Sequence, residues 1–387
     1  MNTKKFTLFA SLFAIIVLTV GFSACDRVSQ IIDPTAPQMP ETSEEISVGV
    51  VLPVTGRLSD TFGSSALQAY ELALSEINAA QPNSAQLKLI IEDNQGTIDG
   101  TVAAFNKLIQ DGVSVILGPA TSGQTEVAFP IAQKNQVVAI SPTSASRGLS
   151  ALGDFVFRVS LTTDVLIPEG IEVTHAKLDY QKAATLYDEE DVFSTDSDAA
   201  VREVLAAKGI EVVATETFKG GDADFSEQLS RIQALDPDVI FVSSLAPDKP
   251  GILTQGHQLG ISATFIVRTL TAAEVQAVSE AAEGAITFVG WGTAVDTPGN
   301  KAFVENYSAK FGMEPTNYAA RPYATFHILA EAIANAQSTD AVSIRDALAS
   351  IKDFDTIFGK FSFDANGDAV YDTKILIVQD GKLVRFE

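Results

Sequence analysis

Two short segments rich in hydroxyl groups contain the residues whose types and spacing could bind a ligand. Residues 118–125 read GPATSGQT and residues 141–146 read SPTSAS, and each segment follows a short apolar run. Free backbone N–H groups and the dipole of a helix beginning near Thr121 would suit a carboxylate or another anionic group. Ser and Thr are also ordinary helix-capping residues. The pattern alone leaves both interpretations open, an anion site and simple capping.

Sequence motifs of catalysis and of metal binding are absent from the chain. It has no Gly-rich phosphate loop with Lys and no Gly-x-Ser-x-Gly motif. His175, His257 and His327 are far apart and each lies in an expected helix, so they do not indicate a metal cluster. Residues 364–368 imitate the start of a calcium loop, but Ala369 stands where that loop requires Gly, which favours a tight turn. We therefore expect no enzymatic activity, no metal and no cofactor.

Cys25 is the only cysteine in the chain, and its surroundings indicate a different kind of chemistry. Lys4 and Lys5 precede an uncharged run over residues 6–22, and two small residues stand directly before Cys25. This order of charge, apolar core and small-residue exit is typical of a secretory signal. An uncleaved signal anchor with an incidental cysteine is the alternative, because the run is nearly long enough to span a bilayer.

A cysteine at the cleavage point resembles the lipobox of bacterial lipoproteins, although Phe22 stands where that box usually has Leu. The resemblance implies a signal peptide over residues 1–24 and acyl chains, such as palmitate, on Cys25. Residues 25–45 are rich in Pro, Ser, Thr and acid, which predicts a disordered tether. We expect the folded part to lie on the extracytoplasmic, periplasmic side of a bacterial cell membrane, held there by its lipid.

The charge balance and the length limit the function further. The chain has 26 Lys and Arg against 49 Asp and Glu, a formal net charge of −23. Such an acidic chain is a poor candidate for binding nucleic acid or an anionic lipid surface. Residues 46–387 are long enough for two domains.

Apolar strands alternate with amphipathic helices along these residues. The expected strands are 47–52, 87–91, 113–117 and 137–140, then 183–186, 212–215 and 239–242, with helices such as 64–79, 199–207 and 225–235 between them. This alternation predicts α/β lobes with parallel sheets covered on both faces. We expect a hinge near residues 154–164, between the two series. In such sheets, ligands bind beyond the carboxyl ends of the strands, where the two hydroxyl-rich segments lie.

Several longer segments occur together in an order that resembles a known family. They include VGVVLPVTGRLSDTFGSSALQAYELALSEINAA, ILGPATSGQTEVAFPIAQKNQVVAISPTSAS and YAARPYATFHILAEAI. Over roughly residues 46–387 the chain resembles the leucine/isoleucine/valine-binding receptors of ABC transporters. The resemblance implies the type I periplasmic binding fold, with two Rossmann-like lobes joined by three hinge crossovers and a last strand near residues 374–378 in the second lobe. The implied N-terminal lobe is 46–163 and 288–370, and the C-terminal lobe is 164–287 and 371–387.

The same resemblance implies a function. It predicts an extracytoplasmic substrate-binding component of an ABC importer, a monomer that closes around a small solute and delivers it to a permease and ATPase complex. The implied ligand is a hydrophobic or branched-chain amino acid, or a related carboxylate or amide. A ligand-sensing receptor of the same fold, coupled to a signalling partner, is the alternative.

Site residues transfer to this chain one at a time. In the family, the residue at Ser122 receives the ligand carboxylate. The next loop adds a Thr, but Ala145 stands there in this chain, so either Ser144 or Ser146 substitutes or the contact is lost. The remaining expected contacts are the backbone of Ala120, Thr121 and Thr143, and an apolar wall of Phe62, Phe193, Leu245 and Ala246.

The expected ammonium site departs from the family. Asp164 matches an acid that helps to hold the ammonium, but Thr269 stands where the family has its principal acidic residue. A buried ammonium without a carboxylate partner is costly. Either Asp164 carries the ammonium alone, or the ligand is not a zwitterion. The neighbouring Arg268 is either a surface charge at the end of a strand or a ligand contact, and of the two we expect the surface charge.

Overall fold

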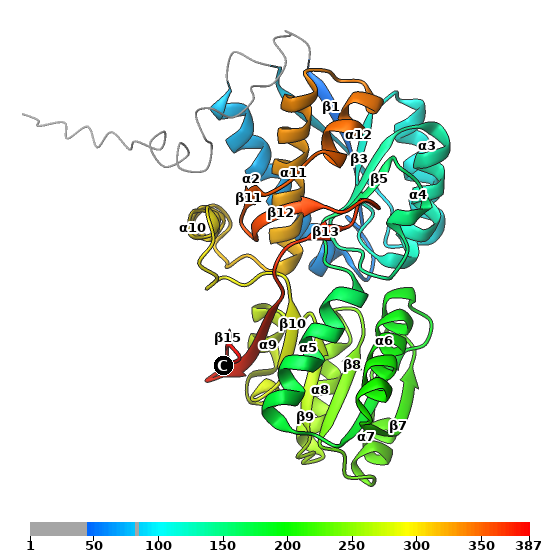
Figure 1. The fold of residues 1–387 in the computed structure, drawn as a ribbon, viewed down its shortest axis with the longest axis vertical. Coiled ribbons are helices and arrows are strands. Elements are labelled where there is room, and N and C mark those ends of the chain that lie inside the picture. The colour runs from blue at the N-terminus through cyan, green and yellow to red at the C-terminus, as the bar shows by residue number, and fades with distance from the viewer. Residues whose placement is uncertain (1–44, 82–84) are drawn as a thin grey trace, which may run out of the picture.

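Two α/β lobes, stacked one above the other, form the part of the chain described by the computed structural model, residues 45–81 and 85–387 (Figure 1). The signal peptide, Cys25 and nearly all of the expected tether lie outside the described residues. Both lobes contain a largely parallel sheet with helices on its two faces, as predicted from the alternation of strands and helices. Within the described residues, no helix combines the length and hydrophobicity needed to cross a membrane.

The first lobe contains a five-stranded parallel sheet with the order β2-β1-β3-β4-β5. Its strands are β1 (Ile46–Leu52), β2 (Leu87–Asp93), β3 (Val115–Leu117), β4 (Val138–Ser141) and β5 (Val156–Arg158). Val50 of β1 packs into the apolar cluster that includes α2 (Ser64–Ala80) and α11 (Asn317–Ala336). The next residue, Val51, packs into the cluster on the other face, with α3 (Ile98–Gln110) and α4 (Ser122–Asn135). Burial of both faces explains why these strands are apolar throughout.

The second lobe contains a seven-stranded sheet with the order β15-β14-β10-β9-β8-β6-β7. Its strands are β6 (Lys182–Asp188), β7 (Glu211–Phe218), β8 (Val239–Ser243), β9 (Thr264–Arg268), β10 (Ile286–Val289), β14 (Lys374–Gln379) and β15 (Lys382–Arg385). Its helices are α5 (Thr163–Leu178), α6 (Val192–Lys208), α7 (Ser226–Gln233), α8 (Lys249–Gln258) and α9 (Ala272–Val278). β14 returns from the first lobe and pairs antiparallel with β10, in the position that the family resemblance implies.

The chain crosses between the lobes three times, at residues 159–162, 290–299 and 371–373. The second crossing leads into α10 (Asn300–Phe311), and the third follows a small antiparallel sheet of β11 (Phe354–Thr356), β12 (Gly359–Phe363) and β13 (Ala369–Val370). The lobe boundary expected at residue 288 falls inside β10, which belongs entirely to the seven-stranded sheet. The chain therefore returns to the first lobe only after Val289.

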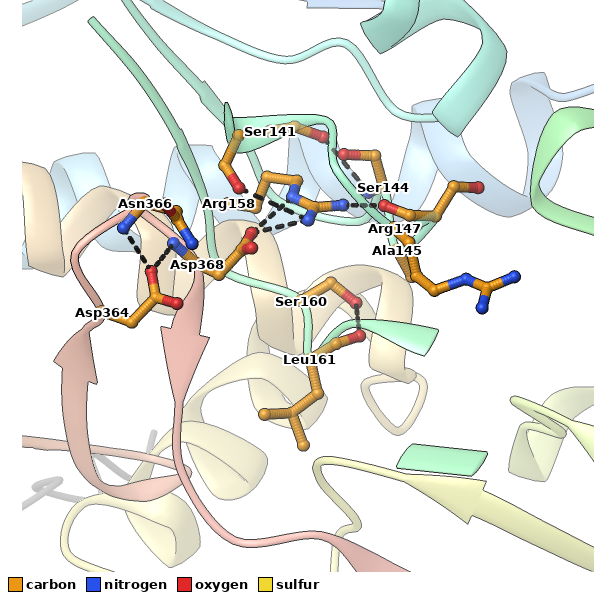
Figure 2. A network of polar contacts seen from close by, with 12 residues as sticks. Ser141, Ser144, Ala145, Arg147, Arg158, Ser160, Leu161, Asp364, Asn366 and Asp368 are labelled. Atoms are coloured by element: carbon orange, nitrogen blue, oxygen red, sulfur yellow. Dashed lines mark hydrogen bonds and ion pairs between the residues drawn. The ribbon is translucent and has the colours of Figure 1, made fainter. Parts of the chain in front are cut away.

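A buried ion pair fixes the first crossing against the turn before β13 (Figure 2). The Arg158 side chain at the end of β5 is completely buried, and its Nε donates to the Asp368 carboxylate at 2.7 Å. Asp364 accepts the backbone N–H groups of Asn366 and Asp368, both at 2.8 Å, so the expected tight turn at residues 364–368 is confirmed. Arg158 also donates to the Ser146 carbonyl, and this contact connects the crossing to the second hydroxyl-rich segment.

Candidate functional site

A pocket lies between the lobes, where the carboxyl ends of both sheets meet. Its empty volume, including the open space at its mouth, is about 390 Å³. The first lobe and first crossing contribute Phe62, Ala120, Thr121, Ser122, Thr143, Ala145, Ser160, Tyr318 and Arg321, and the second lobe contributes Phe193, Ser244, Leu245, Arg268 and Thr269. The pocket thus unites all of the expected ligand contacts except Ser144, Asp164 and Ala246.

The amino terminus of α4 supplies the polar end of this pocket. Thr121 caps the helix through a capping box with Gln124, so the capping interpretation holds for that residue. Ser122, the first residue of α4, has a different role: its Oγ accepts the backbone N–H groups of Ala145 and Ser146, both at 3.2 Å. With its oxygen engaged as an acceptor, the hydroxyl hydrogen of Ser122 remains available to donate into the pocket.

Hydrogen bonds hold the two hydroxyl-rich segments together. The Thr143 hydroxyl donates to the Ala120 carbonyl, and Ser141 Oγ donates to the Pro119 carbonyl at 2.7 Å. Ser144 is buried and its N–H donates to Ser141 Oγ at 3.2 Å, so this residue supports the loop from outside the pocket lining. Together with Arg158, these bonds form a polar floor of the pocket, since each segment is bonded to the other.

The opposite wall of the pocket is apolar. Phe62 and Tyr318 pack with their ring centroids 4.4 Å apart, and Leu245 and Phe193 join them from the second lobe. Ala246 belongs to the same apolar cluster but lies behind the lining. Such a wall suits a hydrocarbon or aromatic part of a ligand.

Arg268 lines the pocket, and the expectation that it is a surface charge is wrong. The residue is 4% exposed, at the carboxyl end of β9. Its guanidinium lies over the Phe193 ring, 5.5 Å from the centroid, and Nη1 makes long contacts of 3.4 Å to Thr269 Oγ1 and 3.5 Å to the Phe288 carbonyl. Nε and Nη2 have no hydrogen-bond partner among the described residues.

A second arginine, Arg321 of α11, lines the pocket from the first lobe and is also 4% exposed. Its Nε has no hydrogen-bond partner in the described part of the chain. Burial and the neighbouring charge of Arg321 lower the pKa of Arg268 to about 9, which still leaves its guanidinium charged at neutral pH. The two arginines line the same pocket from opposite lobes, and their like charges oppose each other.

No acidic side chain is among the described residues that line the pocket. Asp164, the expected ammonium partner, is exposed in the first turn of α5 and lies outside the lining. The physical reason is its position on the helix: Thr163 and Leu166 face inward and are buried, whereas Asp164 points to solvent. Among the described lining residues, the charged side chains are Arg268 and Arg321, so the lining is positively charged.

Thr269 occupies a strained backbone conformation beside Arg268. Its φ is +58°, which is unusual for a β-branched residue. The buried Lys249 donates to the Thr269 carbonyl at 2.8 Å and lies 3.4 Å from a Glu274 carboxylate oxygen. Burial opposes the charge of Lys249, but Glu274 and Tyr318 outweigh it and raise the pKa of the lysine. This charged pair fixes the end of β9 and so helps to position Arg268 at the pocket.

Ion pairs join the lobes around the pocket. Arg57 Nη1 of the first lobe lies 3.2 Å from the Asp248 carboxylate of the second. On another side, Arg147 Nε donates to Asp196 of α6 at 2.7 Å. The lobes therefore form a closed arrangement.

Sequence reasoning missed Ser160, Ser244, Tyr318 and Arg321, and misjudged Arg268. The rule of strand carboxyl ends indicates the loop over residues 243–249, which contains Ser244 although that residue was not singled out, and the same rule could have found Ser160 after β5. Tyr318 and Arg321 lie on a helix and carry no such signal. Within the described residues, no group of three His, Cys, Asp or Glu side chains could hold a metal ion.

A pocket enclosed between two hinged α/β lobes defines a solute-binding protein of the periplasmic type. Residues 45–382 match the model of the periplasmic binding protein family, and the chain belongs to that family. This is a family of solute-binding proteins of ABC transporters rather than enzymes, and its members act outside the cytoplasm.

Comparison with individual proteins points in the same direction. The chain is 26% identical to the Leu/Ile/Val-binding protein BraC3 of Rhizobium johnstonii, over 85% of this chain and 90% of that protein. The crystal structure of the leucine-binding protein LivK of Thermotoga maritima has a TM-score of 0.82 and 25% identity, and the match covers 88% of this chain and 98% of LivK. The branched-chain amino acid binding protein LivJ of Streptococcus pneumoniae, solved with isoleucine, has a TM-score of 0.81 and 29% identity over 88% of this chain and 97% of LivJ.

Proposed function

We propose that this chain is the lipid-anchored receptor of an ABC importer, and that it captures a small carboxylate-bearing solute by closure of its lobes. The observation that carries this proposal is the pocket itself, to which both lobes contribute polar and apolar residues. A ligand held by both walls stabilises the closed state over the open one, which is the basis of a clamshell mechanism.

The proposed anion site is the amino terminus of α4 with the Ser122 hydroxyl. Its support is the available donor of Ser122 together with the helix dipole and the first N–H groups of a long, capped helix. We assign backbone contacts to Ala120, Thr121 and Thr143, and the apolar part of the ligand to the wall of Phe62, Phe193 and Leu245. LivJ was solved with isoleucine. In this chain a carboxylate without an ammonium group fits the charge of the pocket better.

Binding and closure are testable with one intrinsic probe. Trp291 is the only tryptophan of the chain, is 2% exposed, and lies in the second crossing between the lobes, so its fluorescence should report closure. Protein stripped of ligand should be titrated with aliphatic carboxylates, aromatic carboxylates, amides and leucine, with the radius of gyration measured by small-angle scattering. Mass spectrometry of the compound that co-purifies with the mature protein would identify the candidates independently. A tightly bound compound that leaves the radius of gyration unchanged would contradict a clamshell receptor.

The lipid anchor is proposed from Cys25 and needs its own test. Buried acyl chains contribute about 0.8 kcal/mol per CH₂, so a multiply acylated terminus should keep the protein on the membrane. Cys25→Ala should abolish incorporation of labelled palmitate while the released protein still binds ligand. Continued labelling of the variant would show that the anchor lies elsewhere.

A further inference from the structure

We propose that Arg268 and Arg321 form a second anion subsite and that the ligand is a small dicarboxylate, not a zwitterionic amino acid or a monocarboxylate. This inference rests on the proposed function and specifies the chemical class of the ligand. The two arginines lie on opposite lobes, at the end of β9 and on α11, so their subsite exists only in the closed state.

The described lining of the pocket carries the positive charge of two arginines. Each arginine is 4% exposed, and a buried charge is costly unless it is paired. No carboxylate is present among the described residues that line the pocket, so the closed protein buries two like charges in one pocket. A ligand with two negative charges balances both guanidinium groups. A monocarboxylate leaves one positive charge uncompensated, and the ammonium of an amino acid adds a third.

Several N–H donors of the two arginines have no partner in the described residues. Nε and Nη2 of Arg268 and Nε of Arg321 have no hydrogen-bond partner in the described residues. A carboxylate accepts several N–H groups at once, and its bonds to guanidinium groups are among the strongest in proteins. One carboxylate between the two arginines would use these donors and remove the repulsion between the lobes.

The proposed Ser122 site lies on a different element from either arginine. Ser122 lies at the amino terminus of α4, and its donor is independent of both arginines. A monocarboxylate can satisfy one of the two subsites fully, whereas a dicarboxylate can satisfy both. The aromatic wall of Phe62 and Tyr318 then faces the hydrocarbon spacer between the two carboxylates.

Matched probes can test this inference by calorimetry on the mature protein. Succinate, glutarate and adipate are each compared with the monocarboxylate of the same carbon number, for example glutarate with pentanoate, and leucine is measured alongside. We expect the preferred dicarboxylate to bind at least about tenfold more tightly than its matched monocarboxylate, because only the dicarboxylate pairs with the arginines. Leucine should bind weakest, because its ammonium would be buried next to two cations.

Substitution of the arginines should remove this discrimination. In Arg268→Gln and Arg321→Gln the affinity for dicarboxylate should fall at least about tenfold, and the ratio of dicarboxylate affinity to matched monocarboxylate affinity should fall toward one. Arg231→Gln is the control, because Arg231 is about half exposed and paired with Glu216 far from the pocket lining, and it should leave the ratio unchanged. Circular dichroism checks that each variant is folded. Arg321→Lys keeps the charge but not the planar guanidinium, so its ratio of dicarboxylate to monocarboxylate affinity should be intermediate.

The outcomes separate this inference from the proposed function. If leucine or a monocarboxylate binds as tightly as every dicarboxylate and closes the lobes, the receptor function stands and the dicarboxylate assignment fails. Folded arginine variants that keep the wild-type ratio also overturn the second subsite. If none of the probes binds or compacts the protein, both the carboxylate receptor and the dicarboxylate assignment are wrong.

Discussion

The ion pair between Arg158 and Asp368 offers a quantitative test of how the hinge and the polar floor of the pocket are held. The Arg158 side chain is 0% exposed, and Asp368 accepts from its Nε at 2.7 Å and lies 2.6 Å from its Nη2. The remaining guanidinium contacts are to the Ser146 carbonyl and, at 3.5 Å, to Ser150 Oγ. Asp368→Asn keeps the shape of the side chain but leaves the buried guanidinium without a counter-charge.

The expected cost follows from burial. Removing one partner of a buried ion pair typically destabilises a protein by about 3–5 kcal/mol. The Asp368 side chain is 19% exposed, and the Asn oxygen can still accept one N–H group, so we expect about 3 kcal/mol. With a urea dependence of about 3 kcal/mol per M, the unfolding midpoint should fall by about 1 M.

The assay is urea unfolding followed by Trp291 fluorescence and by circular dichroism, with coincident transitions required before a free energy is extracted. Asp372→Asn is the matched control. The Asp372 side chain is 92% exposed and 3.8 Å from Lys374, so its loss should change the unfolding free energy by at most about 0.5 kcal/mol. Replacement of both members of the buried pair, in Arg158→Met with Asp368→Leu, should restore much of the stability.

Two results would refute this reasoning. Equal midpoints for Asp368→Asn and Asp372→Asn would show that Arg158 does not depend on its counter-charge. A double variant as unstable as the single one would show that the packing of these side chains, and not the unpaired charge, determines the cost.

Two further substitutions test closure and pH dependence. A Cβ atom on Gly123 would already lie 3.4 Å from Val192 Cγ2 of the opposite lobe. With saturating ligand, Gly123→Leu should therefore keep the radius of gyration at its open value, whereas Gly123→Ala should still close. Full closure of the Leu variant would contradict this packing. Burial opposes the charge of Glu76, but His327 and the Tyr323 hydroxyl, which donates at 2.6 Å, outweigh it and lower the pKa of Glu76 below 4.5. The stability that ionised Glu76 contributes is complete above its unfolded pKa and is lost as pH falls through its lower folded pKa. The difference in unfolding free energy between wild type and Glu76→Gln should therefore shrink below about pH 4.5. A difference that does not vary with pH would refute this role of Glu76.

The strands could be predicted from the sequence because each is a short apolar run between turn signals. The expected strand over residues 47–52 agrees with β1, and the two hydroxyl-rich segments do meet at the pocket, because the carboxyl ends of neighbouring parallel strands share one edge. The family resemblance, not the local pattern, was needed to place β14 in the second lobe, because its neighbour β10 lies far away in sequence.

The charge of the pocket could not be predicted in the same way. Arg268 ends a strand, and a strand end can face either solvent or a partner lobe. It lines the pocket together with Arg321 of α11, a helix that begins only at Asn317. A pattern read along one segment contains no information about such a distant partner. Asp164 was expected at the pocket and is exposed instead, because it lies one position after the buried Thr163 on α5 and so faces another side of the helix.

The three crossings also affect the order in which the chain can fold. All five strands of the first sheet lie between Ile46 and Arg158, but α11, which covers one of its faces, begins only at Asn317. The hydrogen bond from Tyr323 to Glu76 joins residues 247 positions apart. By contrast, β6 to β10 with their helices form one continuous segment, whose contacts close much shorter loops. The segment from β6 to β10 therefore makes its contacts without the rest of the chain, but both lobes are completed only by elements that follow the second crossing. These elements are α11 in the first lobe and β14 and β15 in the second, and the pocket, which includes Tyr318 and Arg321 of α11, needs this later part of the chain.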